Sequence, residues 1–182
     1  TVDVIKPAAF EQIIGVDGYY ADVDNADTIL LIDTSFTDIA TPDLVASLQA
    51  ARERGARIIS LDPRLGTLGS MAQDWFAVNP GTELAVMLAV CRQIIHSGRY
   101  DKEYVSANVL GFDLWAKAIE QYTPEWAESL SGIQSFRIDE LASYLVGAAP
   151  RVSIELGNGE ISGISYANST ELAKVVCLLN AL

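Results

Sequence analysis

Two short apolar runs separated by a helical pattern constrain the fold of this chain more than any other feature. Residues 28–32 and 57–61 have the continuous apolar pattern of parallel strands that are buried on both faces. Between them, Thr41 and Pro42 suit the N-cap and first position of a helix, and Gly55 suits the left-handed position just past its end. A strand, a helix and a strand in this order predict a right-handed βαβ unit in a parallel sheet.

The remaining patterns extend this unit. We expect a third strand over residues 75–78, a long helix capped by Thr82, and a last strand over residues 151–156. Four short amphipathic helices are expected between the long helix and the last strand, at residues 101–107, 113–121, 124–130 and 135–146. The predicted fold class is α/β: a Rossmann-like three-layer domain with a parallel sheet and a helical insertion in its second half.

The turn residues predict the organisation of the chain. Residues 1–25 are turn-rich and are expected to be a lead-in segment rather than core. Residues 26–150 are expected to form the Rossmann-like domain. Residues 151–182 are expected to be a return strand and a helix, capped by Ser169 or Thr170, that lead toward a neighbouring domain. The last helical pattern continues to Leu182, so we expect the chain to be a piece of a longer protein.

Charge and hydropathy exclude several kinds of partner. The chain has 12 Lys and Arg against 24 Asp and Glu, a net charge of −12, which disfavours binding to nucleic acid or to an anionic membrane surface. The longest apolar run, residues 84–91, is much shorter than the ~20 residues that span a bilayer. No direct membrane insertion is expected, and no signal peptide is visible. An apolar fraction of 50% fits a domain that buries surface against other domains.

The cysteines and the histidine provide no evident catalytic or metal site. Cys91 and Cys177 lie in apolar helical patterns without a second cysteine or a histidine nearby, so zinc and iron–sulfur sites lack ligands. His96 stands at the end of a helical run, where a cation is favoured by the helix C-terminus. We therefore assign no catalytic residue and no metal ligand.

Ligands of open α/β sheets bind beyond the carboxyl ends of the strands, which directs attention to three segments. Asp62 follows the second strand and suits the ribose hydroxyls of a nucleotide, although Asp before Pro also initiates turns. Arg64 could bind a phosphate or a base, or it could be a solvent-exposed surface arginine. Glu83 offers two acceptors for the adjacent donors of guanine, with Gly81 allowing close approach; an acid is also common in any first helical turn.

The segment after the first strand fits a dinucleotide less well. It lacks a G-x-G-x-x-G motif, and its carboxylates would repel a pyrophosphate at close range: Asp33, Asp38 and Asp43. Its hydroxyls and backbone donors could still hold phosphate oxygens, from Thr34, Ser35 and Thr37. Gly157 and Gly159, after the last strand, form a second possible point of close approach.

Several ordered segments together resemble one family. They read NADTILLIDTSF, ARERGARIISLDPR, WFAVNPGTELA and SGRYDKEYV, in this order. They resemble the molybdopterin-containing oxidoreductases of the DMSO reductase family, in particular the branch that reduces sulfur compounds and arsenate. The likeness covers nearly the whole chain.

The resemblance implies that this piece binds molybdopterin guanine dinucleotide. It places Thr34, Ser35 and Phe36 along the diphosphate, and Asp62, Pro63 and Arg64 at the guanosine ribose and its surroundings. It places Pro80, Gly81 and Glu83 at the guanine, and Gly157 and Gly159 on the return to the neighbouring domain. The chain departs from the family pattern in two places: Asp33 replaces the usual glycine, and Glu83 replaces the usual aspartate.

The resemblance also implies what surrounds this piece. The parent would be a polysulfide, thiosulfate or arsenate reductase-like catalytic subunit that carries a four-iron–four-sulfur cluster outside this chain. Its partners would be the remaining domains of that subunit and an iron–sulfur electron-transfer subunit, and its cellular side stays open. The isolated piece is not expected to turn over. 

Two alternatives remain. The first is a scaffold domain related to the large NADH dehydrogenase subunit, which keeps the fold without the molybdenum cofactor and is favoured by Asp33. The second is the central domain of thiamine-diphosphate enzymes, which gives no reason for the helical residues 101–146.

Overall fold

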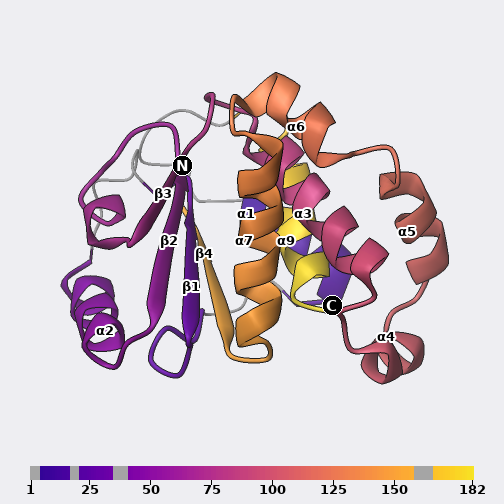
Figure 1. Cartoon of the computed structure of the whole chain (residues 1–182). Helices are drawn as coiled ribbons and strands as arrows, with labels where there is room; N and C mark the ends of the chain where they lie inside the picture. The colour runs from indigo at the N-terminus through magenta and orange to yellow at the C-terminus, as the bar shows by residue number, and fades with distance from the viewer. Residues whose placement is uncertain (1–4, 17–20, 35–40, 158–165) are drawn as a thin grey trace.

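The computed structural model describes residues 5–16, 21–34, 41–157 and 166–182, and within them four parallel strands form one sheet (Figure 1). The sheet order is β3-β2-β1-β4, made by β1 (Thr28–Ile32), β2 (Arg57–Asp62), β3 (Asp74–Ala77) and β4 (Val152–Leu156). Thr28 is in register with Arg57 on one side and with Val152 on the other. The chain therefore leaves β1 toward β2 and β3, and returns much later to the opposite side of β1.

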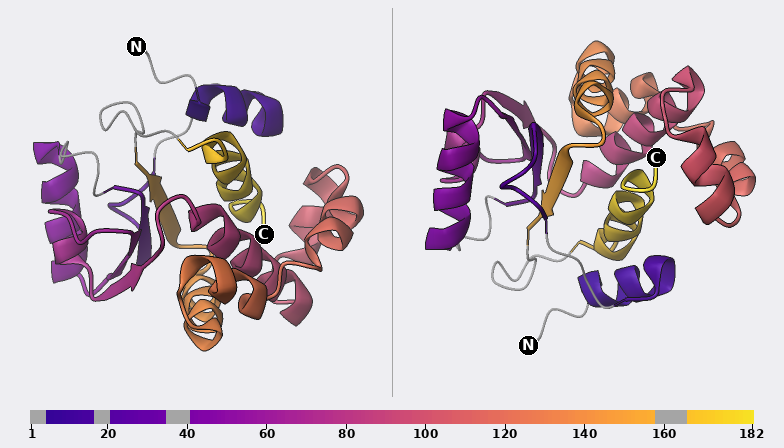
Figure 2. Two further views of the ribbon diagram at one scale, coloured as in Figure 1. Left: turned by 90° about the horizontal axis from the view of Figure 1, so that it is seen from above. Right: turned by 90° about the horizontal axis from the view of Figure 1, so that it is seen from below.

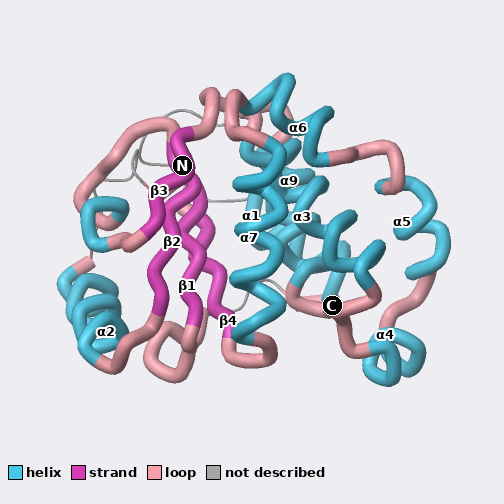
Figure 3. The backbone as a smooth tube through the Cα atoms, viewed as in Figure 1, coloured by secondary structure: helices cyan, strands magenta, loops and turns pink. Residues whose placement is uncertain are grey.

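Helices cover both faces of this sheet, as the views along the strands show (Figure 2). One face is covered by α2 (Pro42–Glu53). The other face carries a thicker layer that contains α3 (Glu83–Ser97), α7 (Ser135–Ala148), α9 (Ser169–Leu179) and α1 (Ile5–Ile14). The outer part of that layer and the loop before β3 hold the short helices: α4 (Lys102–Asn108), α5 (Phe112–Ile119), α6 (Pro124–Ser131) and the 3₁₀ turn Gly69–Met71 (Figure 3).

Burial on both faces explains why β1 is apolar without interruption. Ile29 and Leu31 pack into the core under α2, whereas Leu30 and Ile32 pack into the core under the thicker helical layer. All four side chains are completely buried. Because successive strand residues point to opposite faces, a central strand between two helical layers needs an apolar residue at every position.

The local signals around α2 have the effects that the sequence predicts. Thr41 is the N-cap, and its hydroxyl oxygen accepts a hydrogen bond from the Leu44 N–H at 3.3 Å, ahead of Pro42 at the first helical position. Gly55 follows the helix with a φ of +89°, a conformation that strains other residues. The α/β fold class and the helical insertion are confirmed.

The N-terminal segment differs from expectation. Residues 1–25 are predicted to be a lead-in segment outside the core, but they contain α1, which packs against α9. Ala9 and Phe10 of α1 are buried in the main core. This contact joins the beginning and the end of the chain, so the local turn-rich pattern could not reveal it.

Two helix ends also differ from expectation. The N-cap of α9 is Asn168, one residue before the expected Ser169 or Thr170, and α9 ends at Leu179 rather than continuing to Leu182. Thr82 precedes α3 but makes no capping bond, because its hydroxyl donates to the Asn79 carbonyl at 2.6 Å.

The last residues belong to the same packed unit as the rest. β4 pairs with β1 along its whole length, and the apolar face of α9 lies in the same core as α3 and α7. In the part of the chain that the structure describes, no helix has both the length and the apolar character needed to cross a membrane.

Candidate functional site

Three carboxylates meet where the strands end, at the top of the sheet in Figure 1. Asp33 directly follows β1, Asp62 is the last residue of β2, and Glu83 is the first residue of α3. Asp62 and Glu83 both act electrostatically on Asp33, and Asp62 also acts on Glu83. The structure thus brings together the two acids that the sequence selects for a nucleotide, and adds Asp33 to them. We call these residues the rim cluster.

Hydroxyl groups of Ser60 on β2 and of Thr34, just after β1, hold the Asp62 carboxylate. Its Oδ2 accepts hydrogen bonds from Thr34 Oγ1 at 3.1 Å and from Ser60 Oγ at 3.0 Å. Asp62 and Ser60 are completely buried, and the Trp75 indole N–H donates to the Asp62 carbonyl at 3.0 Å. A buried carboxylate with several donors keeps one orientation, so Asp62 is a fixed acceptor rather than a mobile surface acid.

Glu83 is buried as well, with only 2% of its surface exposed. Its Oε1 has no hydrogen-bond partner among the described residues. Burial raises the pKa of Glu83, backbone N–H groups of Glu83 and Gly81 that bond to the carboxylate lower it, and the nearby Asp62 raises it. The side chain therefore has one satisfied and one unsatisfied oxygen, and an unsatisfied buried acceptor is costly unless a ligand donates to it.

The turn before Glu83 is held by a segment far away in the sequence. Gly81 has a φ of +80°, and a Cβ at this position would lie 3.0 Å from the Tyr166 ring. The Asn168 side-chain amide donates to the Gly81 carbonyl at 2.9 Å. Close contact with an aromatic ring and a positive φ both require glycine here.

Asp33 adopts a conformation that is uncommon outside glycine. Its φ is +52°, and its N–H donates to the Leu61 carbonyl at 3.1 Å. The Oδ1 atom is buried and has no hydrogen-bond partner among the residues that the structure describes. Burial, then the charges of Glu83 and Asp62, raise the pKa of Asp33 to about 7. Near neutral pH this carboxyl group therefore exists in both charge states.

The other predicted residues are placed as follows. Pro63 and Arg64 follow Asp62, Pro63 half-buried and Arg64 exposed, and Pro80 is exposed in the turn before α3. The Gly157 N–H donates to the Ile32 carbonyl at 2.8 Å, which ties the end of β4 to the end of β1. Ser35, Phe36 and Gly159 lie outside the described residues, as do Thr37 and Asp38.

Sequence reasoning missed two members of the site. Ser60 is a polar residue in the otherwise apolar stretch 58–61, and a polar residue in a buried strand indicates a hydrogen-bonding role. Tyr166 carries no local signal, because its contact with Gly81 depends on the fold of the whole chain.

The cysteines are not placed for metal binding. Cys91 and Cys177 are buried in α3 and α9, and burial raises the pKa of each thiol to about 12. Among the described residues, no group of three or more His, Cys, Asp and Glu side chains could hold a metal ion.

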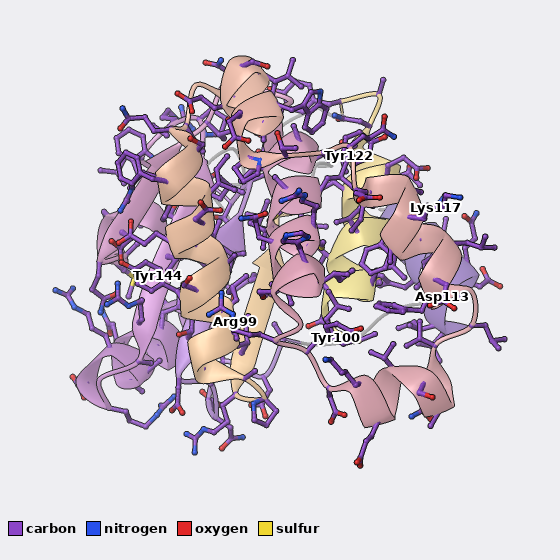
Figure 4. The ribbon with its side chains drawn as sticks, turned by 45° about the vertical axis from the view of Figure 1, so that its right-hand side comes forward. Arg99, Tyr100, Asp113, Lys117, Tyr122 and Tyr144 are labelled. Atoms are coloured by element: carbon purple, nitrogen blue, oxygen red, sulfur yellow. The ribbon has the colours of Figure 1, made fainter. Side chains whose placement is uncertain are left out.

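A separate apolar groove lies at the opposite, amino end of β4. Its volume is about 640 Å³, and its lining includes Val152, Leu145 and Leu182. Arg99 and Tyr100, in the segment that follows α3, also line it (Figure 4). Most of its lining is apolar, in contrast to the carboxylates and hydroxyl groups at the carboxyl ends of the strands.

Comparison with known proteins gives one consistent result. The family model described as molybdopterin oxidoreductase matches residues 6–179. The thiosulfate reductase molybdopterin-containing subunit PhsA of Salmonella typhimurium is 36% identical over 111 residues, which are 61% of this chain and 15% of that protein. The F420-dependent formate dehydrogenase subunit alpha of Methanocaldococcus jannaschii is 30% identical over 158 residues, which are 87% of this chain and 23% of that protein.

One solved structure has the same fold as this chain. Acetylene hydratase from Pelobacter acetylenicus superimposes with a TM-score of 0.87 at 25% sequence identity, covering 97% of this chain and 24% of that one. The chain thus spans only about a quarter, or less, of the relatives that it matches. A family match over almost the entire length, with matching sequence and fold, shows that this chain belongs to the molybdopterin oxidoreductase family.

Proposed function

We propose that this chain is a domain of a molybdopterin oxidoreductase catalytic subunit and binds the guanosine part of molybdopterin guanine dinucleotide. The observation that carries the proposal is the buried carboxylate of Glu83, whose Oε1 has no hydrogen-bond partner among the described residues. It begins α3, where the helix N-terminus favours a negative charge. Such a group is suited to a ligand that brings two adjacent N–H donors.

Guanine has this pattern on its Watson–Crick edge, and adenine does not. A carboxylate can accept two hydrogen bonds from guanine at once, whereas an amide side chain offers one acceptor and one donor. The Tyr166 ring packs against Gly81, so an aromatic side chain borders the turn that precedes Glu83. Asp62, with Thr34 and Ser60 holding Oδ2, fits the role of an acceptor for ribose hydroxyls.

These residues fit the guanosine part of the cofactor better than its phosphates. Among the described residues, Thr34 directs its hydroxyl to Asp62, and Asp33 brings a carboxyl group to the position where the diphosphate is expected. When bound, the cofactor would supply oxygen-atom or sulfur transfer coupled to electrons. This domain would bind and orient it, and the isolated chain would not turn over.

The acidic character of the rim favours one alternative. A scaffold domain that has lost the molybdenum cofactor, as in the relatives of the large NADH dehydrogenase subunit, needs no phosphate site and tolerates carboxylates there. Asp33 is the residue that favours this alternative. The two functions differ in a measurable property, because only the first requires selective binding of guanosine nucleotides.

Thermal unfolding of the 182-residue chain with GDP and with ADP tests the proposal. GDP at about 100 times its Kd stabilises the folded state by about 2.7 kcal/mol, which raises Tm by about 5–10 °C for a chain of this size. ADP at the same concentration should give a much smaller shift. Equal shifts for the two nucleotides, or no shift with either, would favour the scaffold alternative.

Glu83→Gln is the decisive variant. It replaces one acceptor by an amide donor that faces a guanine donor, so GDP affinity should fall at least about tenfold. Glu125→Gln is the matched control, because Glu125 is an exposed glutamate in the first turn of α6. Its GDP affinity should equal that of the unmodified chain. An unchanged affinity for Glu83→Gln would contradict the role of Glu83.

For the complete protein we propose a polysulfide, thiosulfate or arsenate reductase-like subunit. The resemblance of the chain to a thiosulfate reductase subunit supports this class, although formate dehydrogenase subunits are similar too. Its partners would be the other domains of the subunit and an iron–sulfur electron-transfer subunit, and a four-iron–four-sulfur cluster would lie outside this chain. Purification of the complete protein followed by molybdenum and iron analysis tests these assignments.

A further inference from the structure

The topology of the sheet places Asp33 at a position where ligands bind in open α/β sheets. The chain leaves β1 toward β2 on one side and later returns to β4 on the other, so the strand order reverses between β1 and β4. Such a reversal opens a crevice beyond the carboxyl ends of the two strands. Asp33 directly follows β1 and Gly157 directly follows β4, and the Gly157 N–H bonds to Ile32 at this point.

The backbone of Asp33 is held between the ends of β2 and β4. Its left-handed φ of +52° is fixed from one side by the bond from its N–H to the Leu61 carbonyl. From the other side, β4 approaches so closely that a Cβ on Gly157 would lie 1.9 Å from the Asp33 carbonyl oxygen. The buried Oδ1 atom of Asp33 has no hydrogen-bond partner among the described residues. The Asp33 backbone therefore cannot move away without breaking these contacts, and the buried Oδ1 atom, unpaired among the described residues, is an acceptor that a ligand could use.

Titratable groups from several elements surround Asp33. Asp62 on β2 and Glu83 on α3 act on it directly, and Tyr166, just before α9, interacts with both Asp33 and Glu83. Burial raises the pKa of Asp33 to about 7 and raises the pKa of Glu83 and of Tyr166. The neutral forms of all three groups are therefore favoured by burial and by the neighbouring negative charges.

The charge on Asp33 decides how well a diphosphate can bind. A diphosphate ester carries two negative charges, which an ionised Asp33 repels at close range. A protonated Asp33 removes the repulsion and can donate its O–H to a phosphate oxygen. Guanine, in contrast, needs an ionised Glu83. A guanosine diphosphate ester therefore favours the state in which Asp33 is protonated and Glu83 is ionised.

We propose that the rim cluster makes cofactor binding depend on a proton: the domain takes up the guanosine diphosphate portion with Asp33 protonated and Glu83 ionised. This inference rests on the proposed guanosine site and assigns to it a regulation by pH. Asp33 is then a specificity residue that distinguishes a neutral nucleoside from its diphosphate ester as the pH rises. Deprotonation of Asp33 weakens the binding of the phosphates and does not change the binding of the base by Glu83.

Calorimetric titration with two probes between pH 6 and pH 8 tests the inference. GDP-mannose is a diphosphate ester whose charge is constant over this range, and guanosine is neutral. With a pKa of about 7, the protonated fraction of Asp33 falls from about nine-tenths to about one-tenth, so the affinity for GDP-mannose should fall about tenfold. The affinity for guanosine should not fall. An affinity for GDP-mannose that is equal at the two pH values would overturn the inference.

Substitution at position 33 identifies the group responsible. Asp33→Asn cannot release a proton, so its affinity for GDP-mannose should be independent of pH. Asp33→Gly, which suits the positive φ, should behave in the same way and serves if the first variant does not fold. Asp27→Asn is the matched control at the other end of β1, where Asp27 pairs with Arg151 on the surface, and it should keep the tenfold fall.

The outcomes separate this inference from the proposed function. If both probes bind but the variants at position 33 keep the fall in affinity, the inference is wrong and the guanosine site stands. If neither probe binds to the unmodified chain or to Asp33→Asn at any pH, the guanosine site and the inference are both wrong.

Discussion

Substitution of Gly157 by alanine tests the close approach of β4 to β1 at the ligand end of the sheet. An added Cβ would lie 1.9 Å from the Asp33 carbonyl oxygen and 2.6 Å from its carbonyl carbon. Real Cβ contacts are essentially never shorter than 3.0 Å. The obstacle is backbone, so no side-chain rotation can relieve it, and the two strand ends must move apart.

The expected cost follows from the contacts that this movement breaks. The bond from the Gly157 N–H to the Ile32 carbonyl would be lost, at about 0.5–1.5 kcal/mol. Overpacking of a tightly fitted site adds about 1–3 kcal/mol. The free energy of unfolding should therefore fall by about 1.5–4.5 kcal/mol, and Tm should fall on the order of 10 °C for a chain of this length.

Urea unfolding followed by circular dichroism measures this change, with Gly147→Ala as the matched control. Gly147 lies in α7, and a Cβ there would meet nothing within 4 Å. Alanine in a helix is favoured over glycine, so the control should be unchanged or up to about 1 kcal/mol more stable. If Gly157→Ala and Gly147→Ala have the same free energy of unfolding, the ends of β1 and β4 do not approach each other this closely.

Two further predictions concern the rim cluster. The pKa of Asp33 rises from 3.8 in the unfolded chain to about 7 in the folded chain, so the folded state binds the proton more tightly. The free energy of unfolding should therefore fall as the pH rises from about 4 to about 7. Urea unfolding at pH 5 and pH 8 should show a smaller difference for Asp33→Asn than for Asp27→Asn; equal differences would rule out Asp33 as the source. Ser60→Ala leaves the buried Asp62 carboxylate without one donor and should cost about 1–3 kcal/mol, whereas Ser70→Ala, at an exposed hydroxyl, should cost little. Equal unfolding free energies for these two serine variants would show that the Ser60 bond does not hold Asp62.

The central sheet could be predicted because its determinants are local. An unbroken apolar run predicts a strand covered on both faces, and Leu30 and Leu31 indeed enter different cores. Thr41 and Gly55 mark the ends of α2 by their own conformational preferences. The positions of Asp62 and Glu83 then follow from one rule, because the carboxyl ends of parallel strands share an edge.

The parts that could not be predicted depend on contacts between distant segments. Ala9 and Phe10 of α1 are buried because α1 packs against α9, and no property of residues 5–14 alone indicates this contact. The left-handed conformation of Asp33 depends on the register of β1 with β2 and β4. Asp is among the residues that tolerate a positive φ, so the sequence permits this conformation without requiring it.

Tyr166 and Asn168, just before α9, contact both the Gly81 turn and the carboxylates of the proposed site. Asn168 bonds to the carbonyl of Gly81, a residue 87 positions earlier, and the Tyr166 ring lies against the same glycine. Tyr166 also interacts with the charges of Glu83 and Asp33. The turn that would face the base and the carboxyl group that would face the phosphates are thus both linked to this segment. Tyr166 therefore borders both acids, and removal of its ring would change the surroundings of Glu83 and Asp33 together.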